Sequence, residues 1–225
     1  MFDKFKQLFS GESLLDEAFN KTVEMIEYDH EMYIASRKTL RESDTDQLPF
    51  DIRKMDRRIN RYERQVRRHV LTHLTIAGTA NLLPGLALVS VVIDVERIGD
   101  YTKNIVDLAT KHKKPLKAGD LEPALAQIER VNDEIFPKVI EVMKHQDADL
   151  ARSVMDQEKD TAAKSEDVIS RTLTETIPGL TCSNTVCVAM YARFLKRINA
   201  HLTNIASSVV NPFPRISFRE KRLRE

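Results

Sequence analysis

Hydrophobic residues recur along most of this chain at alternating intervals of three and four, the spacing that lines one face of an α-helix. In the first such segment, one stripe contains Leu15, Phe19, Ile26, Tyr33 and Leu40. The same pattern predicts six long helices, at about residues 14–42, 50–80, 84–111, 120–145, 149–176 and 181–210. We therefore predict an all-α protein with more than about 70% helix and no sheet.

Local signals support several of these boundaries. Ser13 followed three residues later by Asp16 resembles a capping box, and Asp120 is placed to cap the fourth helix. Pro137 lies inside the fourth segment and is expected to kink it, because proline removes a helical hydrogen bond. Residues 211–225 contain two prolines and alternate Arg with Glu, so we expect a loosely ordered tail.

The six segments form two groups of three, joined by a Lys-rich connector at residues 112–119. A shift of 100 residues aligns four identical pairs on the third and sixth segments: Arg97/Arg197, Ile98/Ile198, Asn104/Asn204 and Ile105/Ile205. We interpret residues 12–112 and 120–210 as tandem three-helix bundles packed side by side, followed by the tail 211–225.

Composition agrees with a soluble helical protein and disfavours several classes. The 225 residues include only 6 Gly and 8 Pro, few for an all-β chain. With 35 basic and 34 acidic residues the net charge is +1, so no bulk field attracts nucleic acid. The longest apolar stretch, residues 82–93, is shorter than the ~20 residues that span a bilayer. Residues 1–9 lack the apolar core of a signal peptide, so we expect a cytoplasmic protein that is not itself a membrane protein.

The most informative polar pattern lies on the third segment. Glu96, Asp100 and Asn104 are four residues apart and share one helical face. Two carboxylates one turn apart are suitable ligands for Mg²⁺, Mn²⁺, Fe or Zn²⁺, with Asn104 as a weaker third ligand. The alternative is a solvated face with local ion pairs. Because like charges repel at this spacing, either a metal ion or a neighbouring Arg should lie nearby.

Other polar residues have mainly structural interpretations. Asp56, Asn60 and Glu63 form a stripe on the second segment, and we expect them to make a polar network with Arg97. Asp29 lies on the seam of the first segment and should be half-exposed or paired with an Arg, because isolated burial is too costly.

Two features of the second segment carry weaker signals. His69 and His73 have the spacing of zinc ligands, but neighbouring arginines would oppose a cation. The basic run at residues 53–68 is interspersed with acids and matches no nucleic-acid-binding motif. It favours a solvated face, or a docking face for an acidic partner, over nucleic-acid binding.

The stretch DVERIGDYTKNI at residues 94–105 resembles the signature of the PhoU family of bacterial phosphate-uptake regulators. DRRINRYE at residues 56–63 resembles that family's second-helix pattern, and the resemblance covers about residues 12–210. It implies tandem three-helix bundles with a metal-binding (E/D)xxxD motif on the third helix of each. It also implies a cytosolic, non-enzymatic regulator that couples a phosphate transporter to a sensor histidine kinase.

Glu96 and Asp100 match the first metal motif, whereas Lys196 and Ala200 stand where the second motif has its acids. We therefore expect at most one metal site or cluster per chain, of unknown metal. Lys196 would instead pair with an acid of the fifth helix, such as Asp160 or Asp167.

The resemblance also implies self-association. Phe2, Phe5 and Phe9 could support a homodimer. Two alternatives to the regulator are a metal-dependent, phosphatase-like enzyme that uses Glu96 and Asp100, and a ligand-free helical scaffold. The sequence shows no nucleophile–base constellation and no Gly-rich phosphate loop to favour the enzyme.

Overall fold

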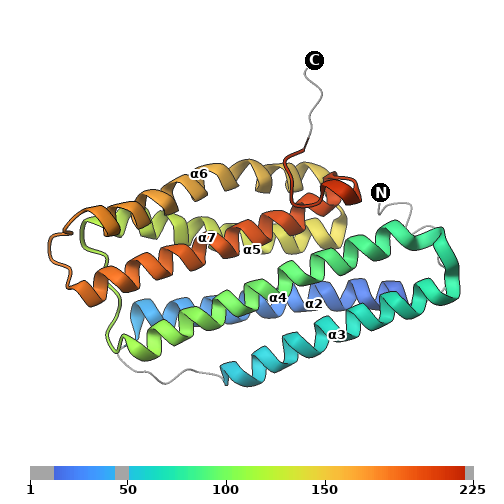
Figure 1. The fold of residues 1–225 in the computed structure, drawn as a ribbon, viewed down its shortest axis with the longest axis horizontal. Helices are drawn as coiled ribbons and strands as arrows, with labels where there is room; N and C mark the ends of the chain where they lie inside the picture. Colours follow the sequence, from blue (N-terminus) through green and yellow to red (C-terminus); the bar gives the residue numbers. More distant parts are fainter. Residues whose placement is uncertain (1–12, 44–50, 221–225) are drawn as a thin grey trace, which may run out of the picture.

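Six long helices make up most of the protein in the computed structural model, which describes residues 13–43 and 51–220 (Figure 1). Of these residues 87% are helical and none lies in a strand, which confirms the all-α prediction. The helices are α2 (Leu14–Glu42), α3 (Ile52–Ala77), α4 (Leu82–Lys111), α5 (Glu122–His145), α6 (Ala148–Thr174) and α7 (Cys182–Val210). Short 3₁₀ turns precede α4 and α5 and follow α7: Gly78–Asn81, Gly119–Leu121 and Phe213–Arg215.

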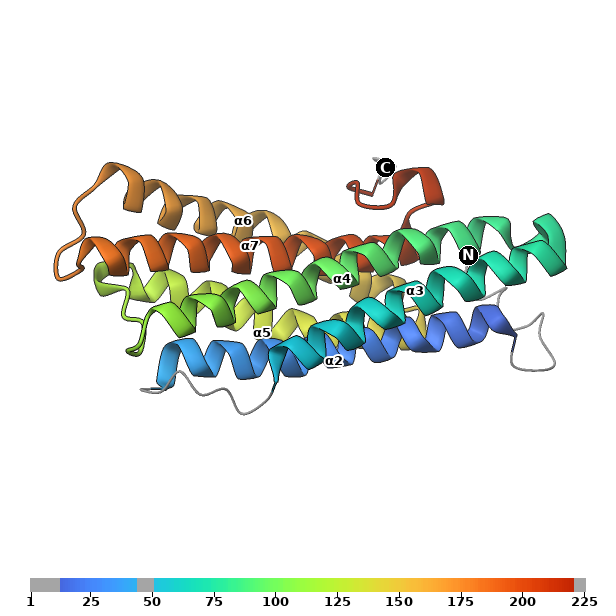
Figure 2. The same ribbon diagram turned by 60° about the horizontal axis from the view of Figure 1, so that its bottom comes forward.

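The helices form two three-helix units that lie side by side (Figures 1 and 2). One unit contains α2, α3 and α4, and the other contains α5, α6 and α7; the two units meet where α4 packs on α7 and α2 packs on α5. The predicted tandem arrangement is thus confirmed. Tyr33 of α2 stacks on Phe136 of α5 at a ring-centroid distance of 5.1 Å, and one hydrophobic core runs through both units. The units therefore stabilise each other.

The structure confirms one predicted cap and corrects another. Ser13 Oγ accepts the Asp16 amide at 3.2 Å and Asp16 Oδ2 accepts the Ser13 amide at 3.1 Å, which is a capping box. Asp120 does not cap α5, because it lies within the 3₁₀ turn before that helix. Glu122 stabilises this start instead: it accepts the Ala118 amide at 2.9 Å and pairs with Arg41 of α2.

The C-terminal tail is more ordered than predicted in its described part, residues 211–220. The Asn211 amide donates to the Phe218 carbonyl at 2.6 Å, and the Ser217 N–H donates to Ser207 Oγ at 2.8 Å. Ile216 is buried against Ala87 of α4. The expectation of a loose tail is therefore wrong here, because these contacts tie the chain back onto α4 and α7.

Ile98, at the centre of α4, is completely buried and should be essential for stability. We predict that Ile98→Ala lowers the free energy of unfolding by about 2–5 kcal/mol, since it removes core contacts and leaves a cavity. Leu173→Ala is the control: Leu173 is 77% exposed, so its loss should change stability by less than about 0.5 kcal/mol. Urea unfolding followed by circular dichroism measures both, and equal effects would contradict the assigned core.

Candidate functional site: an acidic cluster between α2, α3 and α4

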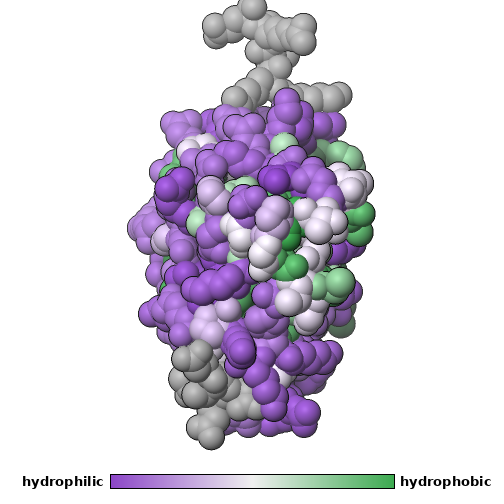
Figure 3. Space-filling view, turned by 90° about the vertical axis from the view of Figure 1, so that its left-hand side faces the viewer, coloured by the Kyte–Doolittle hydropathy of each residue, from purple (hydrophilic) through white to green (hydrophobic). Residues whose placement is uncertain are grey.

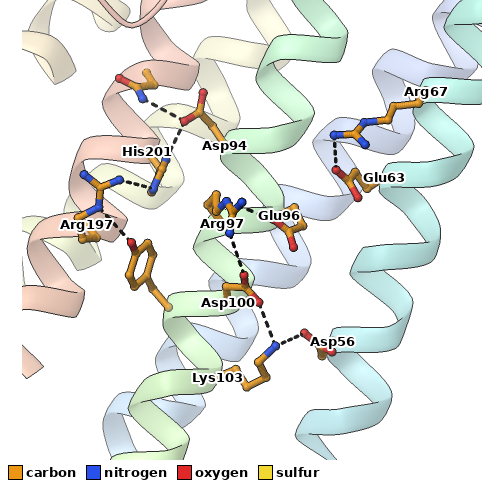
Figure 4. Close-up of polar contacts among 12 residues, drawn as sticks. Asp56, Glu63, Arg67, Asp94, Glu96, Arg97, Asp100, Lys103, Arg197 and His201 are labelled. Carbon is orange, nitrogen blue, oxygen red and sulfur yellow. Dashed lines mark hydrogen bonds and ion pairs between the residues drawn. The ribbon is translucent and has the colours of Figure 1, made fainter. Parts of the chain in front are cut away.

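Helix α4 presents the two carboxylates of the predicted metal motif toward α3 (Figure 4). Glu96 and Asp100 lie one turn apart and are both partly buried. Glu63 of α3 lies near enough to Glu96 to raise its pKa, although burial and the charge of Asp100 contribute more. Asn104, the weaker predicted ligand, is half-buried one turn beyond Asp100.

Asp29 of α2 lies beneath these carboxylates and is completely buried. Neither of its carboxylate oxygens has a hydrogen-bond partner. Burial raises the pKa of Asp29 well above its ordinary value, and the charges of Glu96 and Asp100 raise it further. The expectation that Asp29 would be half-exposed or paired with an Arg is therefore wrong. The sequence could not reveal that the Asp29 carboxylate of α2 lies next to Glu96 and Asp100 of α4.

Gly99 makes room for this arrangement. A Cβ atom at position 99 would lie 2.9 Å from Ile59 Cδ1 and 3.1 Å from Asp29 Oδ1. Such separations are shorter than ordinary van der Waals contact, so a larger residue would press on both side chains. Glycine at this position lets α4 approach α2 and α3 closely enough to enclose Asp29.

Two basic side chains of α4 meet the carboxylates from the solvent side. Lys103 Nζ donates to Asp56 Oδ1 at 2.8 Å and to Asp100 Oδ1 at 2.9 Å, so it joins α3 to α4. Arg97 Nη1 lies 3.4 Å from Asp100 Oδ2, and its Nε lies 3.7 Å from Glu96 Oε2. The predicted pairing of Arg97 with α3 is thus wrong, because Arg97 remains on the outer side of α4 and is 55% exposed.

The stripe on α3 is satisfied by other partners than Arg97. Asp56 is bound by Lys103, and Glu63 pairs with Arg67 at 2.7 Å. The Asn60 amide donates to the Asp56 carbonyl of its own helix at 3.0 Å. Sequence reasoning missed Lys103; its spacing of three from Asp100 was the available signal.

The carboxylates are gathered but not preassembled around one point. Within residues 13–43 and 51–220, no group of three His, Cys, Asp or Glu side chains is arranged to hold a metal ion. The two histidines of α3 also separate: His69 faces Glu17 of α2 at 3.6 Å, and His73 bonds to Asn81 at 3.0 Å. The acidic cluster of Asp29, Glu96 and Asp100 remains a candidate cation site because Asp29 is buried without a hydrogen-bond partner.

The related position in the second repeat is closed by an internal ion pair. Lys196 pairs with Glu166 of α6. The prediction of an acidic partner on this helix is therefore confirmed, although the partner is neither Asp160 nor Asp167. Glu166 follows Glu63 by 103 residues, the interval that also separates Asp29 from Asn132. Asn132 is buried, and its neutral amide donates to the Ile128 carbonyl at 3.0 Å. At this interval the second repeat has a buried amide where the first has Asp29. The buried acid of the second repeat, Glu129, is instead bound by Arg41 and Tyr191.

The fold and site define a class: tandem three-helix bundles with an acidic motif on the third helix of the first bundle. The PhoU domain family model matches residues 22–109 and 125–209, so the chain belongs to the PhoU family. No curated protein matches the chain.

Two solved structures share the fold. The crystal structure of PhoU from Pseudomonas aeruginosa is 20% identical with a TM-score of 0.75, and the match covers 88% of this chain and 95% of that one. The phosphate transport system regulatory protein PhoU from Streptococcus pneumoniae is 17% identical with a TM-score of 0.73, and the match covers 87% and 93% of the two chains. At these identities the likeness is one of fold.

The burial of Asp29 predicts a distinctive pH dependence. Its pKa is higher in the folded than in the unfolded protein, so stability should fall as the pH rises from about 4 toward the folded-state pKa. In chelator-treated protein, we predict that Asp29→Asn raises the free energy of unfolding at pH 7 by about 1–3 kcal/mol, since a neutral amide is cheaper to bury. Below about pH 4 the difference should disappear.

Urea unfolding across this pH range provides the measurement. Asp107→Asn is the matched control, because Asp107 is exposed on α4 and its charge is already solvated. A lower stability of the Asp29→Asn variant at pH 7 without metal would show that the carboxylate has a stabilising partner.

Proposed function

We propose that this protein regulates phosphate transport and phosphate-starvation signalling as a cytoplasmic, metal-binding adaptor between a phosphate transporter and a sensor histidine kinase. Membership of the PhoU family supports the regulatory role. The observation that carries the metal-binding part is the buried, unpartnered carboxylate of Asp29 beneath Glu96 and Asp100.

The donor set suits a hard cation. Asp29, Glu96 and Asp100 supply carboxylate oxygens from α2 and α4, with the Asn104 amide as a weaker addition. Oxygen ligands favour Mg²⁺, Mn²⁺ or Fe, whereas Zn²⁺ more often takes nitrogen or sulfur. A bound cation would lower the pKa of Asp29 and of Glu96. It would also relieve the repulsion from neighbouring carboxylates, which contributes to the raised pKa of both groups.

Entry of the cation requires the basic side chains to move. Lys103 is 33% exposed and Arg97 is 55% exposed, so both can turn toward solvent without breaking the core. Lys103 would then release Asp56 of α3, so metal binding would change the polar connection between α3 and α4. Such a change is a means by which an adaptor could present a different surface to its partners.

We predict one metal-dependent stabilisation per chain. Chelated wild-type protein should gain stability on addition of Mn²⁺ or Fe²⁺, and Glu96→Gln with Asp100→Asn should lose this gain and the metal content. Lys196→Ala is the matched control in the second repeat and should leave both unchanged, because its site has no acid at Ala200. Thermal unfolding and elemental analysis of protein prepared without chelator measure these effects.

The reverse design tests the same reasoning. Lys196→Glu and Ala200→Asp, combined with Asn132→Asp, supply all three missing carboxylates and should add a second bound metal ion. Wild-type protein with metal at the second repeat, or a Glu96/Asp100 variant that still binds one ion, would contradict the proposed site.

The regulatory role requires a test in the native host. Deletion of the gene should activate phosphate-starvation transcription at high phosphate, and the wild-type gene should restore repression. The Glu96→Gln/Asp100→Asn gene should fail to restore it, whereas Lys196→Ala should succeed. An unchanged reporter in the deletion strain would refute the role itself, while restoration by the double variant would refute only its dependence on metal.

A further inference from the structure

The end of the molecule formed by the α3–α4 hairpin exposes an unusual aliphatic surface. Residues 70–93 contain no Asp, Glu, Lys or Arg. Leu71 is 68% exposed, Ile76 78% and Leu83 50%, and Leu82 adds to this apolar tip. By length and composition, an 18-residue window in this part of the chain could cross a membrane, with a mean hydropathy of 1.9, yet only 33% of it is buried.

The turn between α3 and α4 is fixed by its backbone conformation and by a buried hydrogen bond. Gly78 has a φ of 67°, which favours glycine, and the buried side chains of His73 and Asn81 are hydrogen-bonded across the turn at 3.0 Å. The chain therefore reverses its direction between α3 and α4. Figure 2 shows the tip of this hairpin extending past the end of α7. Leu71, Ile76 and Leu83 are held outward on a defined scaffold.

Exposed basic residues lie along α3 up to this tip. Arg57, Arg61, Arg64 and Arg68 recur at helical intervals on an exposed stripe that continues at Leu71. The exposed charged residues of α3 are all basic: Arg53, Lys54, Arg57, Arg61, Arg64, Arg67 and Arg68. The acids of α3, Asp56 and Glu63, are half-buried and face α4. Although the net charge of the chain is only +1, basic side chains are concentrated on the exposed face of α3.

We propose that the α3–α4 hairpin docks on an anionic lipid surface. The aliphatic tip would enter the headgroup region, and Arg64 and Arg68, within about 11 Å of Leu71 along the helix axis, would contact lipid phosphates. An anionic bilayer complements both features at once. An acidic protein or a nucleic acid would satisfy the arginines but leave the aliphatic tip in water. This inference goes beyond the proposed regulatory function and does not depend on it.

Vesicle binding by the full-length protein tests the proposal. Wild-type protein should cosediment with vesicles of phosphatidylcholine containing about a quarter phosphatidylglycerol, and should bind vesicles of phosphatidylcholine alone at least tenfold more weakly. Ile76→Asp should abolish binding, and Arg64→Gln with Arg68→Gln should weaken it at least about tenfold. These positions are exposed, so circular dichroism should show unchanged folding.

The opposite end of the molecule supplies matched controls. Apolar residues are also exposed there within a largely hydrophilic surface (Figure 3), and Leu173 is more exposed than any residue of the tip except Ile76. Leu173→Asp at that end should bind vesicles like wild type. Arg130→Gln with Arg193→Gln, which removes two exposed arginines from α5 and α7, should do the same.

A fluorescence reporter distinguishes insertion from simple attraction. The chain contains no Trp, so Ile76→Trp introduces a single indole at the tip. Its emission should shift to the blue, and brominated lipid should quench it, only when anionic vesicles are added. An indole already shielded before vesicles are added would show that a second copy or another part of the chain covers the tip. That result, failure to bind vesicles, or equal losses in Leu173→Asp and Ile76→Asp would overturn the proposal.

Discussion

The first repeat is organised around one buried carboxyl group. Asp29 is enclosed by α2 and α4, has no hydrogen-bond partner, and lies beneath the two carboxylates of α4. An isolated buried charge is too costly to persist in a protein interior, so this carboxyl group must bind a proton or a cation. Gly99 permits the burial, and Lys103 and Arg97 partly neutralise the outer carboxylates.

The second repeat has the same fold without an unpartnered buried acid at the related position. Asn132 lies at the position related to Asp29, and the ammonium group of Lys196 forms an ion pair with Glu166. An amide can be buried and hydrogen-bonded within its helix, whereas a carboxylate cannot satisfy its charge in this way. The two repeats therefore share one hydrophobic core but differ in the polar groups that they bury. We infer a division of roles, with metal binding in the first repeat and structural support in the second.

Both proposals concern α3 and α4. The acidic cluster lies along their middle, and the apolar tip lies at their connecting turn. Lys103 joins the two helices through Asp56 and Asp100, so its displacement by a cation would alter the same hairpin that carries the tip. Together, the two proposals would bring ion binding and membrane contact into one structural element.

The sequence by itself determined the features that depend on neighbours three or four residues apart. The helical periodicity, the capping box of Ser13 and Asp16 and the carboxylate pair on α4 are all of this kind. The tandem repeat was also readable from the sequence, because a shift of 100 residues aligns identical pairs. Only the tertiary structure decided how the helices rotate against one another. That rotation buries Asp29, turns Lys103 instead of Arg97 toward α3, and exposes Leu71 and Ile76 at the hairpin tip. Asp56 and Lys103 are 47 residues apart, and packing of the whole core, not local spacing, sets which side chains meet across such a distance.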